Sequence, residues 1–347
     1  MQEIDPALRV EDFTYDLPDG AIAQIPVEPR DSSRLLDTRD GSDRVFSELP
    51  KLLEPGDLVV VNRTRVRPAR LTGTRVDTGG SIELLLLGPS GDGGWVALAK
   101  PSRRLRPGIE LEFDEGVIGT ISSDPEDGRV RIRFRGTEDE EGWVGRIGAV
   151  PLPPYIRAEL EDDERYQTIF AEVVGSAAAP TAALHFTDAV VDGLRDRGIE
   201  MTQVELEVGL GTFRPVTTDR LIDHVMHSER FRVGGPAVAA IAACRERGGR
   251  VVAVGTTVMR TLESVATTGG LIEADEGATD LFITPGYRFR VVDLLLTNFH
   301  VPGSTLVALV AAALGESWRD HYESALHRGY RFLSFGDAML CEVPRRR

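Results

Sequence analysis

The chain has 347 residues, with 40 Lys and Arg against 55 Asp and Glu, which gives a formal net charge of −15 at pH 7. This length suggests two domains, and 41% hydrophobic with 27% charged residues is typical of a globular protein and not of a disordered or fibrous one. Only two cysteines occur, Cys244 and Cys341, which excludes a disulfide scaffold and Cys-based zinc or iron–sulfur sites. A reducing, cytoplasmic location is therefore expected.

No segment of the sequence predicts membrane insertion or export. The longest apolar stretch, residues 304–315, is well short of the ~20 residues that span a bilayer, so it predicts a buried helix. The first six residues are acidic and polar, unlike a signal or transit peptide.

The first part of the chain is rich in turns up to a buried strand predicted at 58–61. From about residue 67 to 150, short β-type runs alternate with Gly, Pro and Asp turns, with no convincing helix between them. This spacing predicts a small antiparallel barrel or sandwich. The expected strands span 82–87, 95–99, 109–113, 117–121 and 130–134.

Helices and strands alternate after residue 150. The expected helices begin behind a capping Thr187, at Pro236 and behind a capping Ser304. The expected strands span 202–208, 250–254 and 291–296. This alternation predicts an α/β layered domain. We therefore expect residues 1–66 and 151–347 to form one larger α/β domain, and residues 67–150 to form an inserted small antiparallel β-barrel.

Two strand ends in the α/β part carry polar groups. Thr256 and Thr257 follow Gly255 at a strand-to-helix turn, where backbone N–H groups are exposed, and their hydroxyls either bind a ligand or cap the helix. Asn298 and His300 follow the strand 291–296, and loops at such ends commonly carry functional residues.

Four further segments each allow two interpretations. His185, in a loop ahead of a helix, either transfers protons or bonds a neighbouring carbonyl. Residues 207–215 (EVGLGTFRP) form a glycine turn that permits either unusual backbone dihedral angles or close ligand approach, and it lacks the dinucleotide fingerprint. The His224, His227 and Glu229 side chains suit either surface pairing or a metal, and we expect no metal. Asp337, after another glycine turn, is a ligand contact or a solvated turn residue.

Basic residues gather near and within the β-rich part, in contrast to the acidic chain as a whole. Arg65, Lys100, Arg103 and Arg104 belong to this group, and the arginines of the run 129–135 alternate with apolar residues. Such a region either grips a phosphate backbone or is a solvated strand face.

Taken in chain order, these segments resemble one family, the S-adenosylmethionine:tRNA ribosyltransferase-isomerases of queuosine biosynthesis. The matching blocks run through nearly the whole chain in family order, and the family has an α/β domain with an inserted β-barrel. The blocks are 15–18 (YDLP), 28–35 (EPRDSSRL), 62–66 (NRTRV), 151–156 (PLPPYI), 164–167 (ERYQ), 179–181 (APT), 184–187 (LHFT), 208–216 (VGLGTFRPV), 226–229 (MHSE), 255–257 (GTT), 260–264 (RTLES), 285–287 (PGY), 297–300 (TNFH) and 330–339.

The resemblance implies an enzyme that uses S-adenosylmethionine as a co-substrate, with no prosthetic group. It would transfer the ribosyl part to 7-aminomethyl-7-deazaguanine at the wobble position of tRNA and isomerise it, giving epoxyqueuosine and releasing adenine and methionine. A tRNA with a GUN-type anticodon is the implied partner, and a monomer is the family expectation. Such chemistry needs a base beside the sulfonium carbon, a donor for adenine, and groups that position the acceptor amine.

The resemblance also implies roles for residues inside its blocks. His185 and His300 are the acid/base candidates, and Glu229 and Asp337 would orient a histidine or balance the sulfonium charge. The candidate contacts to S-adenosylmethionine or the base are Thr181, Thr256, Thr257, Arg260 and Asn298. The candidates for the tRNA backbone are Arg65, Lys100, Arg103 and Arg104.

The sequence departs from the family at a few positions, among them Glu207, where family members usually carry His. Two alternatives therefore stay open. One is a relative that uses S-adenosylmethionine on a different 7-deazapurine acceptor, and the other is a non-catalytic RNA-binding protein.

Overall fold

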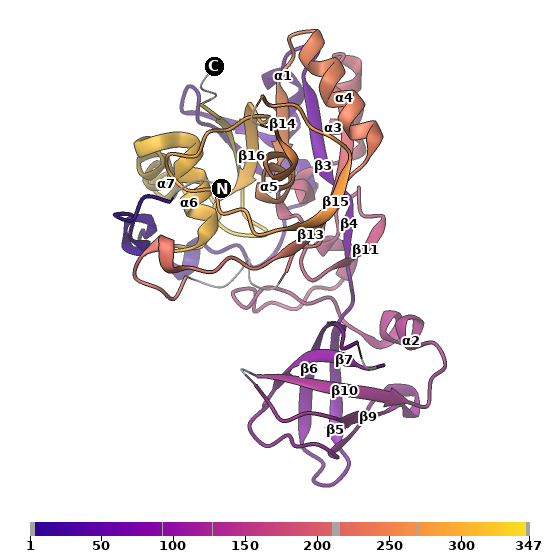
Figure 1. Cartoon of the computed structure of the whole chain (residues 1–347). Helices are drawn as coiled ribbons and strands as arrows, with labels where there is room; N and C mark the ends of the chain where they lie inside the picture. The colour runs from indigo at the N-terminus through magenta and orange to yellow at the C-terminus, as the bar shows by residue number, and fades with distance from the viewer. Residues whose placement is uncertain (1–3, 92, 127, 210–215, 268, 345–347) are drawn as a thin grey trace. The chain divides into compact units, whose positions relative to one another are not determined.

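The computed structural model describes residues 4–91, 93–126, 128–209, 216–267 and 269–344. The chain divides into two compact units (Figure 1). The first unit comprises Met1–Arg65 and Pro153–Arg347, and the second comprises Val66–Leu152. None of the described helices is long and apolar enough to cross a membrane.

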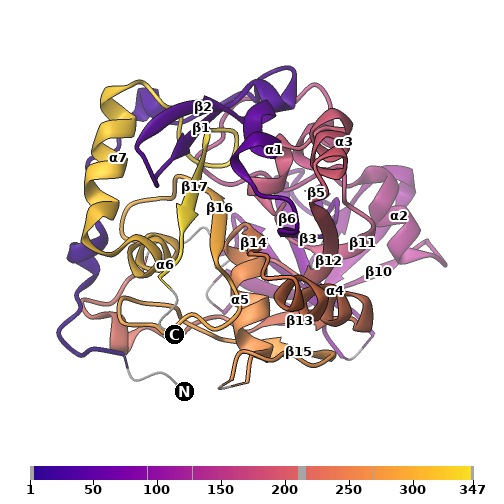
Figure 2. The same cartoon turned by 90° about the horizontal axis from the view of Figure 1, so that it is seen from above.

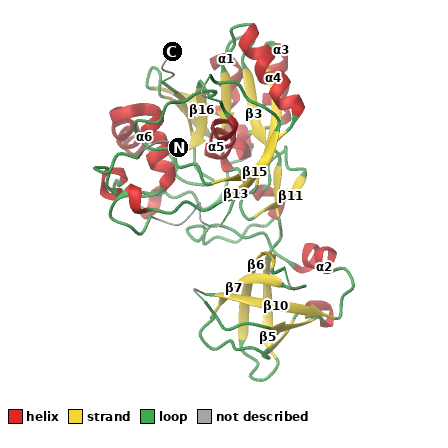
Figure 3. Ribbon diagram, viewed as in Figure 1, coloured by secondary structure: helices red, strands yellow, loops and turns green. Residues whose placement is uncertain are grey.

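Within the described residues, nine strands of the first unit form one mixed sheet (Figure 3). In spatial order they are β15 (Asp275–Thr279), β13 (Glu229–Val233), β12 (Glu200–Leu206), β3 (Leu58–Asn62), β14 (Val251–Val254), β16 (Leu294–Asn298), β17 (Ala338–Glu342), β1 (Arg34–Asp37) and β2 (Ser42–Val45). A two-stranded sheet pairs β4 (Thr64–Val66) with β11 (Val173–Ser176).

The centre of the large sheet is parallel and buried on both faces. β3 pairs in parallel with β12 and β14, and β14 pairs in parallel with β16. Side chains alternate along β3, so Leu58 and Val60 join one hydrophobic cluster while Val59 and Val61 join the other. A strand covered on both sides reads as a continuous apolar run, which is why the sequence predicted it. The carboxyl ends of these parallel strands meet at one edge of the sheet.

Helices cover both faces of this sheet (Figure 2). On one side lie α1 (Leu49–Leu52) and α3 (Asp188–Asp196), and on the other lie α4 (Gly235–Glu246), α5 (Thr256–Val265) and α6 (Thr305–Leu314), followed by α7 (Trp318–His327). Both predicted caps are confirmed, because the Thr187 hydroxyl accepts from the Val190 N–H and the Ser304 hydroxyl accepts from the Val307 N–H. The predicted α/β architecture is therefore confirmed.

The strand expected at 291–296 begins later than the sequence indicated. Val291 and Val292 donate their N–H groups to one carboxylate oxygen of Glu263, each at 3.0 Å, instead of to a neighbouring strand. β16 therefore begins at Leu294. Apolar residues predict burial well, but they do not reveal that a distant side chain has captured the backbone.

The second unit is a closed barrel of six strands within its described residues. In order around the barrel they are β10 (Arg129–Arg135), β7 (Trp95–Lys100), β6 (Ser81–Pro89), β5 (Arg70–Arg75), β8 (Glu110–Glu112) and β9 (Ile118–Ile121). The barrel confirms one of the two predicted β architectures. The sequence analysis missed β5, which has few apolar residues.

The expectation of no helix in the β-rich part was wrong. A helix, α2 (Glu140–Ile147), is capped by Asp139, whose carboxylate accepts from the Gly142 N–H at 2.9 Å. Trp143 of α2 is fully buried, with its ring 4.9 Å from that of Phe134. A single buried aromatic on eight residues is too little periodicity to predict a helix.

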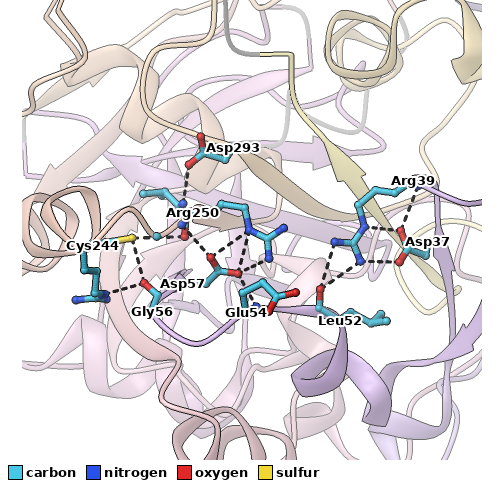
Figure 4. Close-up of polar contacts among 12 residues, drawn as sticks. Asp37, Arg39, Leu52, Glu54, Gly56, Asp57, Cys244, Arg250 and Asp293 are labelled. Atoms are coloured by element: carbon cyan, nitrogen blue, oxygen red, sulfur yellow. Dashed lines mark hydrogen bonds and ion pairs between the residues drawn. The ribbon is translucent and has the colours of Figure 1, made fainter. Parts of the chain in front are cut away.

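At the amino ends of the parallel strands, charged side chains are held by the protein's own groups (Figure 4). The Asp57 carboxylate pairs with the Arg250 guanidinium at 2.6 Å and accepts from the Arg250 N–H at 2.9 Å. Asp293 likewise pairs with Arg245 at 2.6 Å and accepts from the Val251 N–H at 2.7 Å. These contacts fix the loops that precede β3, β14 and β16, so this edge has a structural role.

Candidate active site

A pocket in the first unit lies where β14 and β16 end. Its walls come mainly from four segments, and the lining residues fall within 179–182, 255–257, 297–301 and 333–334, together with Tyr155, Val208, Ser304 and Leu306. Five of the residues predicted from the sequence line it, namely Thr181, Thr256, Thr257, Asn298 and His300. Among the described residues that line the pocket, none is an Asp, Glu, Lys or Arg. Within the described part of its lining, the pocket is therefore uncharged and largely apolar, and its polar side chains are hydroxyl groups, one amide and one imidazole.

His185 is buried beside this pocket and does not line it. Its Nε2 lies 3.1 Å from the side-chain amide nitrogen of Asn298, and its Nδ1 lies 2.8 Å from the Ser33 hydroxyl. Because an amide nitrogen only donates, Nε2 accepts and Nδ1 carries the proton. The Asn298 oxygen accepts from the Thr181 hydroxyl at 2.8 Å. Both ring nitrogens of His185 are therefore occupied, and the ring fixes Asn298 and, through it, Thr181.

His300 is the histidine that lines the pocket. Its Nε2 lies 3.0 Å from the Thr297 hydroxyl. The Tyr322 hydroxyl accepts from the His300 N–H at 3.2 Å, and the Tyr15 hydroxyl donates to the His300 carbonyl at 2.5 Å. These contacts hold the backbone on both sides of the ring. Among the described residues, Nδ1 has no hydrogen-bond partner.

Burial keeps both histidines neutral. It lowers the pKa of His300 to about 3. The pKa of His185 is also lowered to about 3, first by burial and then by the guanidinium groups of Arg331, Arg165 and Arg30. At neutral pH each ring is therefore an uncharged imidazole.

The α5 helix begins at the pocket without a side-chain cap. Its N-cap is Gly255, with a φ of 88°, a conformation that favours glycine. The Thr257 hydroxyl, one residue inside the helix, is buried and has no hydrogen-bond partner in the structure. Thr256 and Thr257 are only 6% and 7% exposed. The sequence left open whether these hydroxyls cap the helix, and the structure shows that they do not.

Glu229 and Arg260 form a buried ion pair in a neighbouring pocket, which neither His185 nor His300 lines. Glu229 also accepts from the Gly209 N–H at 2.8 Å, and Arg260 donates to the Leu281 carbonyl at 2.9 Å. The pair lines that second pocket together with His224 and His227. Within the described ranges, no three or more His, Cys, Asp or Glu side chains gather as metal ligands would.

The structure places Asp337 under the strand ends and outside the pocket. Its two carboxylate oxygens accept from the N–H groups of Arg34 and Arg331, at 2.9 and 2.8 Å. The side chain is 2% exposed. These bonds join the start of β1 to the turn before β17, which is a structural arrangement.

The candidate cations differ in their pairing. In the first unit, the Arg65 guanidinium forms an ion pair with Glu164. In the barrel, Lys100, Arg103 and Arg104 are exposed, and among the described residues their side chains have no ion-pair partner. These three charges are free to meet an external anion.

Glu207 is exposed and lies outside the first pocket. Much of the predicted glycine turn, residues 210–215, lies outside the described residues. The sequence analysis did not single out Ser33, Tyr155 or Ser334. Tyr155 and Ser334 line the pocket and share a hydrogen bond of 2.7 Å. All three lie within the family blocks 28–35, 151–156 and 330–339, which were the available signal.

Comparison with known proteins agrees with this architecture. The family model described as "Queuosine biosynthesis protein" matches residues 10–341. An S-adenosylmethionine:tRNA ribosyltransferase-isomerase of Moorella thermoacetica is 52% identical, over 96% of this chain and 99% of that protein. One of Heliobacterium modesticaldum is 51% identical over the same shares.

A solved structure is similar over nearly the whole chain. The crystal structure of an S-adenosylmethionine tRNA ribosyltransferase from Thermotoga maritima is 36% identical, covers 95% of this chain and 99% of its own, and gives a TM-score of 0.53. With the family model and relatives near 50% identity, this confirms the resemblance read from the sequence blocks, and the chain belongs to the queuosine biosynthesis protein family.

Proposed function

We propose that this chain is an S-adenosylmethionine:tRNA ribosyltransferase-isomerase. It transfers the ribosyl part of S-adenosylmethionine to 7-aminomethyl-7-deazaguanine at the wobble position of tRNA and isomerises it to epoxyqueuosine, with release of adenine and methionine. One observation carries the proposal: five residues predicted from separate family blocks line a single pocket at the carboxyl ends of β14 and β16. The names of relatives that are about half identical over nearly the full length support it.

His300 is the proposed proton-transfer group. The reaction needs a base for the proton on the carbon beside the sulfonium and a donor for the departing adenine. Of the two candidate histidines, only His300 lines the pocket, and its Nδ1 has no partner among the described residues. His185 is assigned a positioning role, because both of its ring nitrogens are occupied by Ser33 and Asn298.

The remaining candidates divide between binding and support. Thr181, Thr256, Thr257 and Asn298 are proposed to contact S-adenosylmethionine or the acceptor base, because they line the pocket and carry its polar atoms. The ion pair of Glu229 and Arg260 is proposed to support the neighbouring wall, since Leu306 lines both pockets. The Asp337 carboxylate is proposed to hold the strand ends in place.

The tRNA partner is proposed to bind through basic side chains, of which Lys100, Arg103 and Arg104 are exposed and Arg65 is paired with Glu164. Lys100, Arg103 and Arg104 of the barrel, with Arg65 of the first unit, are the candidates for phosphate contacts. A GUN-type anticodon, a monomeric enzyme and a cytoplasmic location belong to the same proposal. So does the division into an α/β domain of residues 1–66 with 151–347 and an inserted barrel of residues 67–150, which the two compact units support.

The test is a reaction of the purified protein with S-adenosylmethionine and tRNA that carries 7-aminomethyl-7-deazaguanine. Digested nucleosides are weighed by mass spectrometry, and free adenine is followed in parallel. Epoxyqueuosine formed together with adenine is the expected result. Adenine without the modified nucleoside would instead indicate a different acceptor, and tRNA binding without affinity for S-adenosylmethionine would indicate a non-catalytic RNA-binding protein.

A further inference from the structure

The amino end of α5 has several unused hydrogen-bond donors. The first N–H groups of any helix have no partner within the helix, and in the part of the chain that the structure describes no side chain caps those of α5. α6 begins at the same pocket, but there the Ser304 hydroxyl accepts from the Val307 N–H. The unused donors and the helix dipole together favour an anionic oxygen at the amino end of α5.

An unpartnered hydroxyl points independently to a ligand at this turn. Thr257 is 7% exposed, its Oγ1 has no hydrogen-bond partner among the described residues, and the residue lines the pocket. A buried hydroxyl without a partner is unfavourable in the empty protein, so a ligand atom that satisfies it is the simplest reason for its presence.

Gly255 leaves room beside that hydroxyl. A Cβ built on Gly255 would lie 3.5 Å from Oγ1 of Thr257 and 3.6 Å from Cβ of Ala182. A side chain here would therefore narrow the space between the α5 turn and the segment that carries Thr181. The positive φ of Gly255 also disfavours any other residue. The turn is thus a narrow cradle with donors on its α5 side.

We infer that the first turn of α5, with the Thr256 and Thr257 hydroxyls, binds the α-carboxylate of the methionine part of S-adenosylmethionine. This inference rests on the proposed function. The described residues that line the pocket include no Arg or Lys, and the amino end of α5 offers backbone donors and the positive end of the helix dipole to a carboxylate. An RNA phosphate fits less well, because the two threonines are more than nine-tenths buried.

The opposite side of the cradle suits the α-ammonium group of the same amino acid. The Thr181 hydroxyl donates its proton to the Asn298 oxygen at 2.8 Å, which leaves lone pairs on Thr181 Oγ1 as acceptors. A carboxylate at α5 and an ammonium at Thr181 would place the zwitterion across the narrow gap between Gly255 and Ala182.

The experiment tests whether Thr257 binds the carboxylate of S-adenosylmethionine. Calorimetry measures the Kd of S-adenosylmethionine and of its decarboxylated analogue for the full-length wild type and for Thr257→Val. We expect the variant to raise the Kd of S-adenosylmethionine roughly ten- to a hundredfold, the usual range for a lost hydrogen bond to a charged group. The Kd of the decarboxylated analogue should stay within about threefold of the wild-type value. Thr257→Ser keeps the hydroxyl and should restore the wild-type Kd.

Thr284→Val is the matched control. The Thr284 hydroxyl is also buried and has no hydrogen-bond partner within the described ranges, but Thr284 does not line the pocket. Both Val variants should keep or raise the Tm of the ligand-free protein, because each removes an unsatisfied polar atom. Only Thr257→Val should weaken the binding of S-adenosylmethionine.

Three results would overturn the inference. The first is an unchanged Kd for S-adenosylmethionine in Thr257→Val, and the second is an equal loss of affinity for S-adenosylmethionine and its decarboxylated analogue. The third is a loss of affinity for tRNA alone, which would assign the cradle to a phosphate. Epoxyqueuosine formation by the wild type is measured in the same preparations. If Thr257→Val selectively weakens binding of S-adenosylmethionine but the wild type forms no epoxyqueuosine, the proposed function alone is contradicted. If the wild type forms epoxyqueuosine but Thr257→Val shows no such selective loss, the carboxylate site alone is contradicted.

Discussion

Nε2 of His185 accepts a hydrogen bond from the side-chain amide of Asn298 at 3.1 Å, so a buried imidazole orients a residue that lines the pocket. His185, an acid/base candidate in the sequence, is therefore proposed to act on the site through Asn298. Of the two candidate histidines, only His300 lines the pocket. Substitution of His300 should therefore act mainly on kcat, and substitution of His185 mainly on KM.

His300→Ala should lower kcat by roughly 10²- to 10⁴-fold, because it removes the proposed proton-transfer group, while the Kd of S-adenosylmethionine changes little. Release of adenine and formation of epoxyqueuosine give the rate, and calorimetry gives the Kd. His321→Ala is the control, since His321 lines a different pocket, near Arg39 and Asp293. Normal turnover in His300→Ala would remove this residue from the mechanism.

His185→Ala should act mainly on the KM of S-adenosylmethionine, because Asn298 loses the acceptor that fixes its amide. Asn298→Ala should raise the same KM. If the two residues act as one unit, the double variant will be no worse than the more damaging single variant, which a double-mutant cycle measures. Additive effects would show that His185 does not work through Asn298.

The stability of the protein should fall as the pH falls from 6.5 towards 3. The pKa of His185 and that of His300 are each lowered to about 3 in the folded protein, against about 6.5 when unfolded. In that window the unfolded chain binds more protons, so the free energy of unfolding rises with pH and is fully present above about 6.5.

Urea unfolding at pH 7.5 and at pH 5 measures this effect. Each buried histidine should contribute on the order of 2 kcal/mol to the difference. His300→Asn removes one titrating ring, so its pH-dependent loss should be smaller than that of the wild type by about this amount. An identical loss in the two proteins would show that His300 is not held neutral by burial.

Arg103→Ala combined with Arg104→Ala should weaken tRNA binding and leave the Kd of S-adenosylmethionine unchanged. Each phosphate contact that is lost should reduce the slope of log Kd against log salt by roughly 0.7–0.9. Arg135→Ala is a matched control on the same barrel, because Arg135 is exposed but already paired with Glu110 at 2.8 Å. Unchanged tRNA binding in the double variant would favour a small-molecule acceptor.

The sequence by itself determined the layers of this protein and the segments that carry its site. Continuous apolar runs such as β3, the capping side chains of Thr187 and Ser304, and the barrel's alternating pattern are local signals, because they arise from the periodicity of strands and the hydrogen-bonding needs of helix ends. The family blocks similarly identified Thr181, Thr256, Thr257, Asn298 and His300 before any geometry was known.

Only the tertiary structure decided which of those residues meet. His185 and His300 look alike in sequence, yet one is enclosed between Ser33 and Asn298 and the other lines the pocket. The sequence allowed Asp337 to be a ligand contact or a solvated turn residue, yet its buried carboxylate accepts from the backbone N–H group of Arg34, far away in the chain. Burial and long-range hydrogen bonds depend on which distant segments pack together, and one-dimensional periodicity does not contain that information.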